Sequence, residues 1–269
     1  MFVHPNFDPV AFSIGPVFGL GPLSVHWYGL MYVAAFASVY GLWVYRAKAY
    51  DYYDQTTWNA ETISDLVFYG ALGAVLGGRI GYVLFYKPME YLSDPISVVN
   101  FQEGGMSFHG GLLGVIIALF LFARRLDVSF MQVAEFVAPV APIGLFFGRM
   151  GNFINQELWG KTTDAPWGMV FSNGGPLPRH PSMLYEAFLE GLLLLLVLWL
   201  VARKPRPVGV LSGIFLVGYS ASRILVEFVR VPDEHLNYLF FDWVTMGQVL
   251  SLPMLCLGLF LVLRANRLS

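Results

Sequence analysis

Long apolar stretches constrain the fold of this chain more than any other feature of its sequence. A helix needs about 20 mostly apolar residues to cross the roughly 30 Å hydrocarbon core of a bilayer. About seven stretches meet this requirement, at approximately 25–45, 63–86, 110–123, 133–150, 183–202, 211–228 and 245–263. Charged residues make up only 13% of the chain, against about 25% in soluble domains. We therefore expect an all-α membrane protein with about seven transmembrane helices.

The third stretch, 110–123, is short for a full crossing. An alternative is that it begins within the membrane, after a re-entrant loop formed by 101–111. Irregular backbone is tolerated at that depth only where protein or a water-filled cavity surrounds it. The sequence leaves both arrangements open.

Glycines spaced four residues apart predict close contacts between helices, because lipid offers no hydrophobic drive for helix association and small residues let backbones approach. The glycines with this spacing are Gly73, Gly77 and Gly81, then Gly110 and Gly114, then Gly144 and Gly148. We interpret them as packing positions rather than as parts of a functional site.

Positive charge predicts which helix ends lie in the cytoplasm, because Lys and Arg in short loops accumulate on that side. The ends assigned to the inside carry Arg46, Lys48, Arg124, Arg125, Arg203, Lys204, Arg206, Arg264 and Arg267. The opposite ends carry only Lys87, Lys161, Arg179 and Arg230. We therefore expect the N-terminus outside and the C-terminus in the cytoplasm. The chain is expected to form a single transmembrane domain, 1–269, with segment 152–182 as a small cap on its outer side.

Charge and cysteine content disfavour several functional classes. A formal net charge of -2 offers no basic surface for nucleic acid. The single cysteine, Cys256, excludes an intrachain disulfide and a thiolate metal cluster. The sequence has no His-x-x-x-His pair and no nucleotide-binding glycine loop, so we expect neither a metal nor a cofactor. Residues 1–45 contain no Lys or Arg, so the first apolar stretch is expected to remain in the mature protein.

Ionisable side chains within apolar stretches need a physical reason, because an Arg at the centre of a span costs roughly 2.5 to 3.5 kcal/mol on insertion scales. Arg149 and Asn152 share one helix face, and Arg223, Glu227 and Arg230 form a second stripe. The predicted topology collects these groups at the outer ends of the helices. The residues expected there are Tyr28, Arg79, His109, Arg149, Asn152, Arg223, Glu227 and Arg230.

Each of these residues also has a structural alternative. Arg223 and Glu227 could form an internal ion pair that holds helices together, and Arg79 and Arg230 could extend to the interface by snorkelling. A lone histidine in a glycine-rich loop is often structural, and a tyrosine at a helix end can belong to the interfacial aromatic belt. No packing requirement explains why all of these groups converge on one side, so we expect a site.

Guanidinium groups and a histidine together suit chemistry at an anionic phosphate. A guanidinium binds phosphate through a fixed fork of donors and stays cationic at low dielectric. Histidine is the side chain whose ordinary pKa lets it accept a proton near neutral pH. The combination predicts nucleophilic displacement at a phospholipid headgroup, assisted by a base and by stabilisation of the phosphate.

Five ordered motifs extend along the chain: HWYGLMY at 26–32, GGMSFHGG at 104–111, GRMGNFINQELWG at 148–160, HPSMLYE at 180–186 and RILVEFVR at 223–230. In these motifs the whole chain resembles the prolipoprotein diacylglyceryl transferase family of bacterial inner membranes. The resemblance implies transfer of the diacylglyceryl group of phosphatidylglycerol to the lipobox cysteine thiol of a preprolipoprotein. The products are then a thioether and glycerol 1-phosphate. It also implies a site that faces the periplasm, where the cap 152–182 would lie, and no cofactor.

The same resemblance implies roles for individual residues. Catalysis is assigned to His109, Arg149 and Arg223. Substrate binding is assigned to Tyr28, Arg149, Asn152, Glu157, Glu227 and Arg230. A cationic pocket lowers the pKa of a substrate thiol, which is near 8.5 when unperturbed. We therefore expect the arginines to contribute more to catalysis than His109, which assists deprotonation.

Two positions depart from the pattern of the family that the chain resembles. Gln156 stands where relatives often have Gly, and Glu135 stands where an Asp is common. Neither change removes an expected catalytic group. We expect Gln156 to affect the local geometry next to Arg149.

Two other functional classes fit parts of the sequence. In a secondary transporter or channel the buried cations would line an anion path, but such folds are expected to show internal repeats and broken helices at mid-membrane. We find no repeat, and the charges gather at one end of the helices. In a non-catalytic lipid-binding scaffold the same cluster would bind phosphatidylglycerol without releasing glycerol phosphate.

Overall fold

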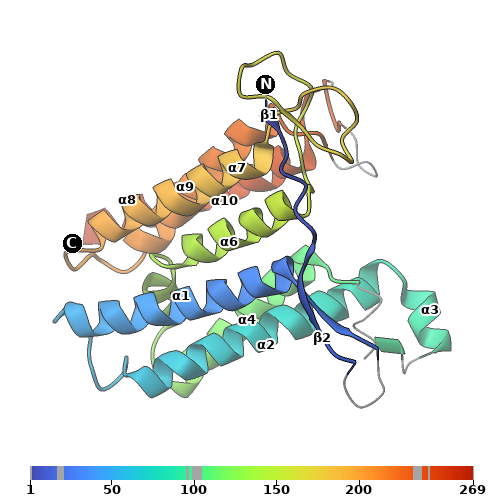
Figure 1. Cartoon of the computed structure of the whole chain (residues 1–269). Coiled ribbons are helices and arrows are strands. Elements are labelled where there is room, and N and C mark those ends of the chain that lie inside the picture. The colour runs from blue at the N-terminus through green and yellow to red at the C-terminus, as the bar shows by residue number, and fades with distance from the viewer. Residues whose placement is uncertain are drawn as a thin grey trace. The chain divides into compact units, whose positions relative to one another are not determined.

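The computed structural model of the protein describes residues 2–16, 21–94, 97–98, 105–232, 238–241 and 243–268. Figure 1 shows that long helices make up most of this part of the chain. In chain order the elements are β1 (Phe2–Val3), β2 (Val10–Ile14), β3 (Leu23–His26), α1 (Trp27–Ala49), α2 (Ala60–Phe85), α3 (Pro88–Ser93), α4 (Phe108–Arg125), α5 (Phe130–Val137), α6 (Ala141–Ile154), β4 (Met169–Val170), α7 (Ser182–Glu186), the π-helical segment η2 (Ala187–Leu193), α8 (Leu194–Val201), α9 (Val210–Glu227) and α10 (Met246–Leu268).

Among the described residues, six helical segments are long and apolar enough to cross a membrane. They are α1, α2, α4, the continuous segment Ser182–Val201 formed by α7, η2 and α8, then α9, and most of α10. The interrupted pair α5 and α6 brings the number to seven if it counts as one span. The expected all-α membrane protein with about seven transmembrane helices is therefore confirmed.

The irregular span is the fourth rather than the third. The third stretch forms the 18-residue helix α4, which is long enough for a full crossing. Residues 101–104, which begin the proposed re-entrant loop, lie outside the described residues. The fourth stretch is interrupted between α5 and α6, with Pro139 in the break and Pro142 in the first turn of α6. Proline has no backbone N–H to donate and disfavours helical geometry in the residue before it, which explains the break.

The chain divides into two compact units, which are described separately. The second unit is Trp43–Phe136, and its two long helices, α2 and α4, pack through glycines. A Cβ added at Gly73 would lie 2.6 Å from the backbone oxygen of Gly114, and one added at Gly81 would lie 2.7 Å from Cα of Gly110. The prediction of close packing is confirmed for these glycines, since any side chain would separate the two backbones.

The same prediction is wrong for the pair in α6. A Cβ added at Gly144 or at Gly148 would meet no atom within 4 Å among the described residues. A spacing of four between glycines therefore marks a possible contact face, and the neighbouring helix decides whether the face is used.

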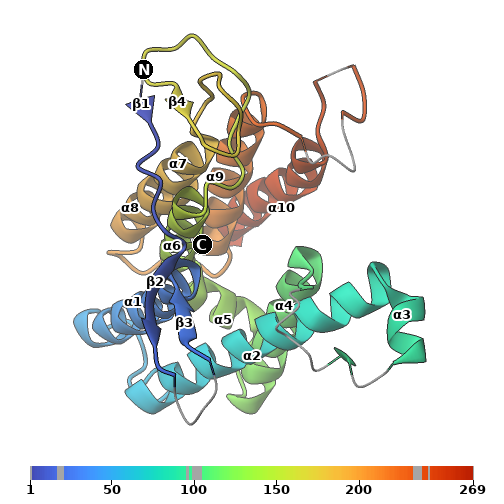
Figure 2. The same ribbon diagram turned by 45° about the vertical axis from the view of Figure 1, so that its right-hand side comes forward.

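The first unit consists of the described residues on either side of the second. It contains α6 and the three long helical segments α7–η2–α8, α9 and α10, which lie side by side in both views (Figures 1 and 2). Apolar residues of α8 and α9 fill its interior around Leu194, Leu198 and Leu211. The expected single domain 1–269 stays a prediction.

The N-terminal segment is attached to the loop region after α6. β1 pairs in parallel with β4, with Phe2 opposite Met169. The imidazole of His4 is buried, contacts the backbone oxygen of Phe153 through Nε2 at 2.9 Å, and accepts a hydrogen bond from the N–H of Asn6. Burial lowers the pKa of this imidazole, so its neutral form is the one that this packing favours.

Segment 152–182, the predicted cap, has an ordered core of its own. Short antiparallel bridges join Thr162 to Arg179 and Met169 to Arg179. The guanidinium of Arg179 stacks over the ring of Trp159, 4.0 Å from its centroid. Burial lowers the pKa of His180, whose Nδ1 contacts the Tyr185 hydroxyl at 3.1 Å. A further bridge joins Gly160 to Arg230, so this segment connects directly to the end of α9.

Candidate functional site

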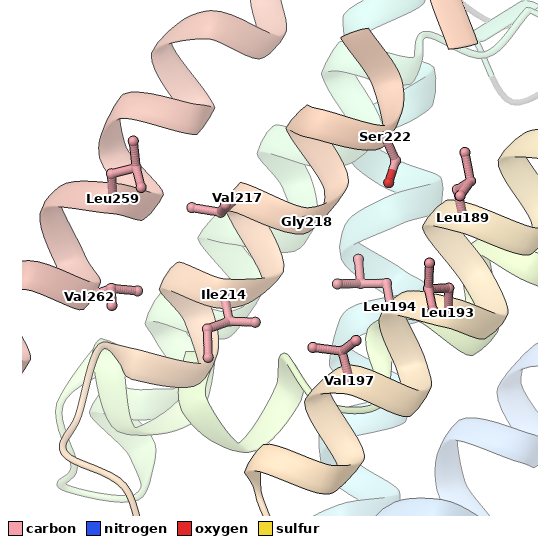
Figure 3. Close-up of a pocket in the computed structure, with 10 residues that line it drawn as sticks. All are labelled: Leu189, Leu193, Leu194, Val197, Ile214, Val217, Gly218, Ser222, Leu259 and Val262. Atoms are coloured by element: carbon pink, nitrogen blue, oxygen red, sulfur yellow. The ribbon is translucent and has the colours of Figure 1, made fainter. Parts of the chain in front are cut away.

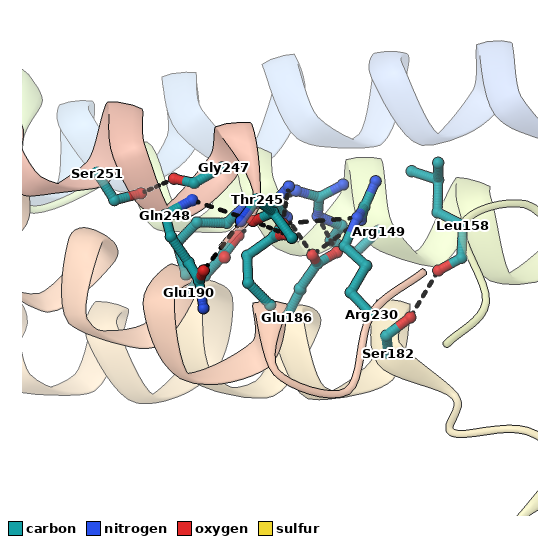
Figure 4. Close-up of polar contacts among 12 residues, drawn as sticks. Arg149, Leu158, Ser182, Glu186, Glu190, Arg230, Thr245, Gly247, Gln248 and Ser251 are labelled. Carbon is teal, nitrogen blue, oxygen red and sulfur yellow. Dashed lines mark hydrogen bonds and ion pairs between the residues drawn. The ribbon is translucent and has the colours of Figure 1, made fainter. Parts of the chain in front are cut away.

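A cluster of charged side chains lies inside the first unit, contributed by three helical segments (Figure 4). Arg149 and Asn152 project from α6, and Arg223 and Glu227 from α9, with Arg230 just beyond its end. These positions are three or four residues apart within each element, so each set shares one helix face. The third segment contributes two acids, Glu186 from α7 and Glu190 from η2.

Glu186 is the centre of this cluster. Its side chain is 0% exposed. One carboxylate oxygen pairs with Nε of Arg149 at 2.9 Å, and the other pairs with Nη1 of Arg230 at 3.0 Å and also with Nη1 of Arg223. A charge this deeply buried is stable only when it is paired. All three arginines therefore share this carboxylate as a partner.

Glu227 forms the second acidic partner. Its Oε1 pairs with Nη2 of Arg223 at 2.6 Å and lies 3.7 Å from Nε of Arg230. The Thr245 hydroxyl donates to its other oxygen at 2.6 Å. Thr245 also accepts a hydrogen bond from the N–H of Gln248, whose side chain accepts from the Thr245 N–H. This reciprocal capping box at the start of α10 holds the hydroxyl that fixes Glu227.

Glu190 is held much less tightly than the other two acids. Its side chain is 0% exposed, and its Oε2 lies 3.6 Å from Nη2 of Arg149. Among the described residues, Arg149 is the only cation within ion-pairing distance of it. It belongs to a π-helical segment, a geometry that is frequent at functional sites.

Asn152 links the cluster to the loop after α6. Its Oδ1 lies 3.5 Å from Nη1 of Arg149, at the limit of a hydrogen bond, and its Nδ2 donates to Glu157 at 3.1 Å. Asn155 donates to the other oxygen of Glu157 at 3.0 Å. The Tyr28 ring covers α6 beside Asn152, because a Cβ at Gly151 would lie 2.6 Å from that ring.

An apolar cavity of about 370 Å³ is lined by residues of η2, α8, α9 and α10 (Figure 3). Leucines and valines of η2, α8, α9 and α10 line it, and Ser222 is its hydroxyl-bearing member. Ser222 precedes Arg223 directly, so α9 carries both the apolar lining and a guanidinium of the cluster.

Comparison with known proteins shows which family this chain belongs to. A sequence model described as prolipoprotein diacylglyceryl transferase matches residues 15–264. The chain belongs to this family. Proteins named phosphatidylglycerol–prolipoprotein diacylglyceryl transferase are similar over nearly their whole length. The one from Pseudomonas aeruginosa strain LESB58 is 52% identical over 99% of this chain and 97% of its own. Those from Legionella pneumophila strain Lens and Nitratidesulfovibrio vulgaris strain DP4 are 51% and 54% identical, each over 97% of this chain and over 98% and 96% of their own.

Seven of the eight site residues expected for this transferase-family chain lie in the first unit. They are Tyr28, Arg149, Asn152, Glu157, Arg223, Glu227 and Arg230. The contacts described above connect the last six, and Tyr28 contacts the same helix. The internal ion pair of Arg223 and Glu227, which was the structural alternative for these two residues, is present. Arg230 is buried and ion-paired rather than snorkelling.

His109 lies in the second unit, in the first turn of α4. Ser107 caps this helix by accepting a hydrogen bond from the N–H of Gly110, which fixes where the turn begins. Its role in the family chain stays a prediction from the resemblance.

Arg79 acts as a structural residue in the second unit. Its side chain is buried, and its guanidinium donates to the backbone oxygens of Ser97 at 2.8 Å, Val98 at 2.7 Å and Gly105 at 3.2 Å. A guanidinium that satisfies several carbonyls in this way anchors the chain before α4 to α2. Its burial and these carbonyl contacts show that it does not extend to the interface by snorkelling.

Two members of the cluster, Glu186 and Glu190, were missing from the expected site. Both stand within an apolar stretch, four residues apart. An acid inside a membrane span is by default a candidate for a functional role, and two acids at this spacing share a helix face. The spacing of two acids within an apolar stretch was therefore a sequence signal for both residues.

The loop that carries Glu157 contains Gln156, the residue that stands where relatives often have Gly. Gln156 has a φ of 56° and Leu158 a φ of 61°, a left-handed conformation that favours glycine. The Gln156 side chain accepts hydrogen bonds from the N–H and hydroxyl of Ser172 at 2.8 and 2.9 Å and donates to Asn6 at 3.2 Å. The side chain therefore binds the loop to two other segments, which offsets part of its backbone strain.

Proposed function

We propose that this chain transfers the diacylglyceryl group of phosphatidylglycerol to the thiol of the lipobox cysteine in preprolipoproteins, the first step of bacterial lipoprotein maturation. Its family membership and the names of its relatives support this function. The observation that carries it is the convergence of Arg149, Arg223 and Arg230 on one buried carboxylate within a membrane span. Three guanidinium groups at the end of an apolar bundle suit a ligand with an anionic headgroup and apolar chains.

The reaction is a nucleophilic displacement at carbon. The sulfur of the substrate cysteine forms a C–S bond to the glyceryl carbon that carries the phosphate, and the C–O bond to the phosphate breaks. The bonding electrons leave with the phosphate oxygen, so negative charge increases on glycerol 1-phosphate. The thiol proton passes to a base, the role assigned to His109. Preorganised cations near the phosphate stabilise that charge as it develops.

The roles of the cluster residues follow from how each is held. Arg149 and Arg223 keep 18% and 16% of their side chains exposed, so they are the guanidinium groups best placed to contact a headgroup. Arg230 and Glu227 are more deeply buried and orient Arg223. Asn152 and Glu157 extend the site from the end of α6, and Tyr28 lines it. The cavity beside Ser222 suits an acyl chain, because its lining is apolar.

The protein is proposed to act in the bacterial inner membrane, as one functional domain, 1–269. The excess of Lys and Arg at the opposite helix ends supports a cluster that faces the periplasm, with 152–182 as a cap there. The lipobox cysteine of the signal peptide would reach the site from the membrane.

A reconstituted assay tests this function against its rivals. The purified full-length protein is incubated with phosphatidylglycerol vesicles and a lipobox peptide, and glycerol 1-phosphate and the lipidated peptide are measured. We expect both products in equal amounts, and neither with a peptide that has Ser in place of the lipobox Cys. Binding of phosphatidylglycerol without either product would favour a scaffold. Anion flux across liposomes without lipid modification would favour a transporter.

A further inference from the structure

Among the described residues, the charged cluster contains three arginines and three glutamates. Among the described residues, its ion pairs join the cations Arg149, Arg223 and Arg230 to the acids Glu186, Glu190 and Glu227. A phosphodiester would bring another negative charge into a buried region, where an uncompensated charge is costly. A phosphodiester that binds one of these arginines therefore competes with the acid that now contacts it.

The distances identify which acid can give up its arginine. Glu186 pairs with Arg149 at 2.9 Å and with Arg230 at 3.0 Å, and Glu227 contacts Arg223 and Thr245 at 2.6 Å each. Charge-assisted N–H···O bonds are typically about 2.7 to 2.9 Å long. Among the described residues, Glu190 forms a single ion pair, with Arg149 at 3.6 Å.

Arg149 also has two terminal nitrogens whose contacts are long. Its Nε is committed to Glu186, but Nη2 lies at the long distance from Glu190 and Nη1 lies 3.5 Å from Asn152. Its side chain is 18% exposed whereas that of Glu190 is 0% exposed. A ligand can therefore reach Arg149 from the open side while Glu190 stays behind it.

We propose that Glu190 is a displaceable counter-ion of Arg149. It neutralises the guanidinium while the site holds no anion, and it yields Nη2 to the phosphate when lipid binds. By competing with the phosphate, Glu190 weakens the binding of both phosphatidylglycerol and the released glycerol 1-phosphate, which lets the product leave. Glu190 is a positioning residue, and this role rests on the proposed function of the site.

The test separates the charge of Glu190 from its shape. Glu190→Gln removes the charge with almost no change in size, and Glu190→Asp keeps the charge but shortens the side chain. Asp65→Asn is the matched control, because Asp65 pairs with Arg125 at 2.9 Å on the surface of the second unit. All are full-length proteins assayed with phosphatidylglycerol vesicles and a lipobox peptide, with glycerol 1-phosphate as the inhibitor.

We expect Glu190→Gln to lower both the KM for phosphatidylglycerol and the inhibition constant of glycerol 1-phosphate about tenfold, which corresponds to about 1.4 kcal/mol. Its kcat should not rise, because product leaves more slowly. Asp65→Asn should match the wild type within about twofold, since its ion pair is exposed at the surface. Glu190→Asp should shift both constants less than Glu190→Gln does, because it keeps the negative charge. An unchanged or raised KM in Glu190→Gln would overturn the proposal. So would equal shifts in Glu190→Gln and Glu190→Asp, or a Glu190→Gln protein that no longer folds.

A binding measurement with an anionic lipid tests the role of Glu190 independently of the transfer reaction. Titration with dioctanoyl phosphatidylglycerol, followed by its effect on the Tm, measures anion affinity without any transfer. Dioctanoyl phosphatidylcholine is the zwitterionic control. If the wild type transfers nothing but Glu190→Gln binds the anionic lipid about tenfold more tightly, the function fails and the counter-ion role stands. If transfer occurs and the affinity is unchanged, the counter-ion role fails alone.

Discussion

The carboxylate of Glu186 illustrates how a single residue can organise several others. Burying an ion pair adds little net stability, because desolvation of both charges offsets their attraction. Removing one partner is different, since it leaves the others buried without compensation. Glu186 has three such partners, Arg149, Arg223 and Arg230. Its contribution to stability therefore appears mainly when it is lost.

Glu186→Gln is expected to destabilise the protein by about 3 to 5 kcal/mol and to abolish transfer, because it removes the common acid of three arginines. Thermal unfolding in detergent and the peptide assay measure the two effects. Glu90→Gln is the control: Glu90 pairs with Lys87 at 2.8 Å on the surface, and such pairs contribute about 0 to 1 kcal/mol. Similar Tm values for the two variants would contradict the central role of Glu186.

Arg149→Ala should remove nearly all transfer, whereas His109→Asn should leave measurable activity. Arg149 pairs with two buried acids, and a thiol near cations ionises without a dedicated base. Initial rates with phosphatidylglycerol and a lipobox peptide compare the variants. Arg149→Lys is informative beside them, since it keeps the charge but lacks the planar fork of donors. Equal residual activities of Arg149→Ala and His109→Asn would reject this ranking.

At the scale of a loop, the left-handed backbone at Gln156 determines how two substitutions there rank in stability. A non-glycine residue in this region costs about 1 to 2 kcal/mol, and Gln156 offsets that cost through its contacts with Asn6 and Ser172. Gln156→Ala keeps the strain and loses the contacts, whereas Gln156→Gly loses both. We therefore expect the alanine variant to be less stable than the glycine variant by about 1 kcal/mol, measured by thermal unfolding. The opposite order would show that backbone strain is unimportant there.

At the scale of a helix pair, α2 and α4 depend on the absence of side chains between them. In Gly73→Ala the new Cβ would lie 2.6 Å from the Gly114 oxygen and 2.8 Å from Cβ of Ala118. Overpacking of this kind costs about 1 to 3 kcal/mol. Gly70→Ala is the matched control, since a Cβ at Gly70 meets nothing within 4 Å. We expect a lower Tm only for Gly73→Ala, and equal Tm values for both would contradict glycine-mediated packing.

At the scale of the whole molecule, the orientation in the membrane is open to a direct test. Single cysteines are introduced by Asp164→Cys and Lys204→Cys, both exposed positions, in a Cys256→Ser background. A membrane-impermeant maleimide applied to spheroplasts should label the first and should reach the second only after permeabilisation. This pattern follows from the excess of Lys and Arg at the helix ends that include Lys204. The reverse labelling would invert the proposed topology and the proposed side of the site.

The sequence alone determined the features that depend on near neighbours in the chain. Apolar length predicted the membrane-spanning segments, because crossing a bilayer requires a continuous run of apolar residues. Helical periodicity grouped Arg149 with Asn152 and Arg223 with Glu227, because residues three or four apart share a face whatever the helix packs against. Those parts of the site were therefore predictable.

The tertiary structure decided which faces meet. It brought Glu186 and Glu190 to arginines that are 37 or more positions away in the sequence, showed which glycines pack, and assigned Arg79 to backbone carbonyls. Such contacts depend on the rotation and separation of neighbouring helices, and periodicity within one helix carries no information about either. An ion pair requires its atoms within about 4 Å, so only the packed helices determine which acid each arginine binds.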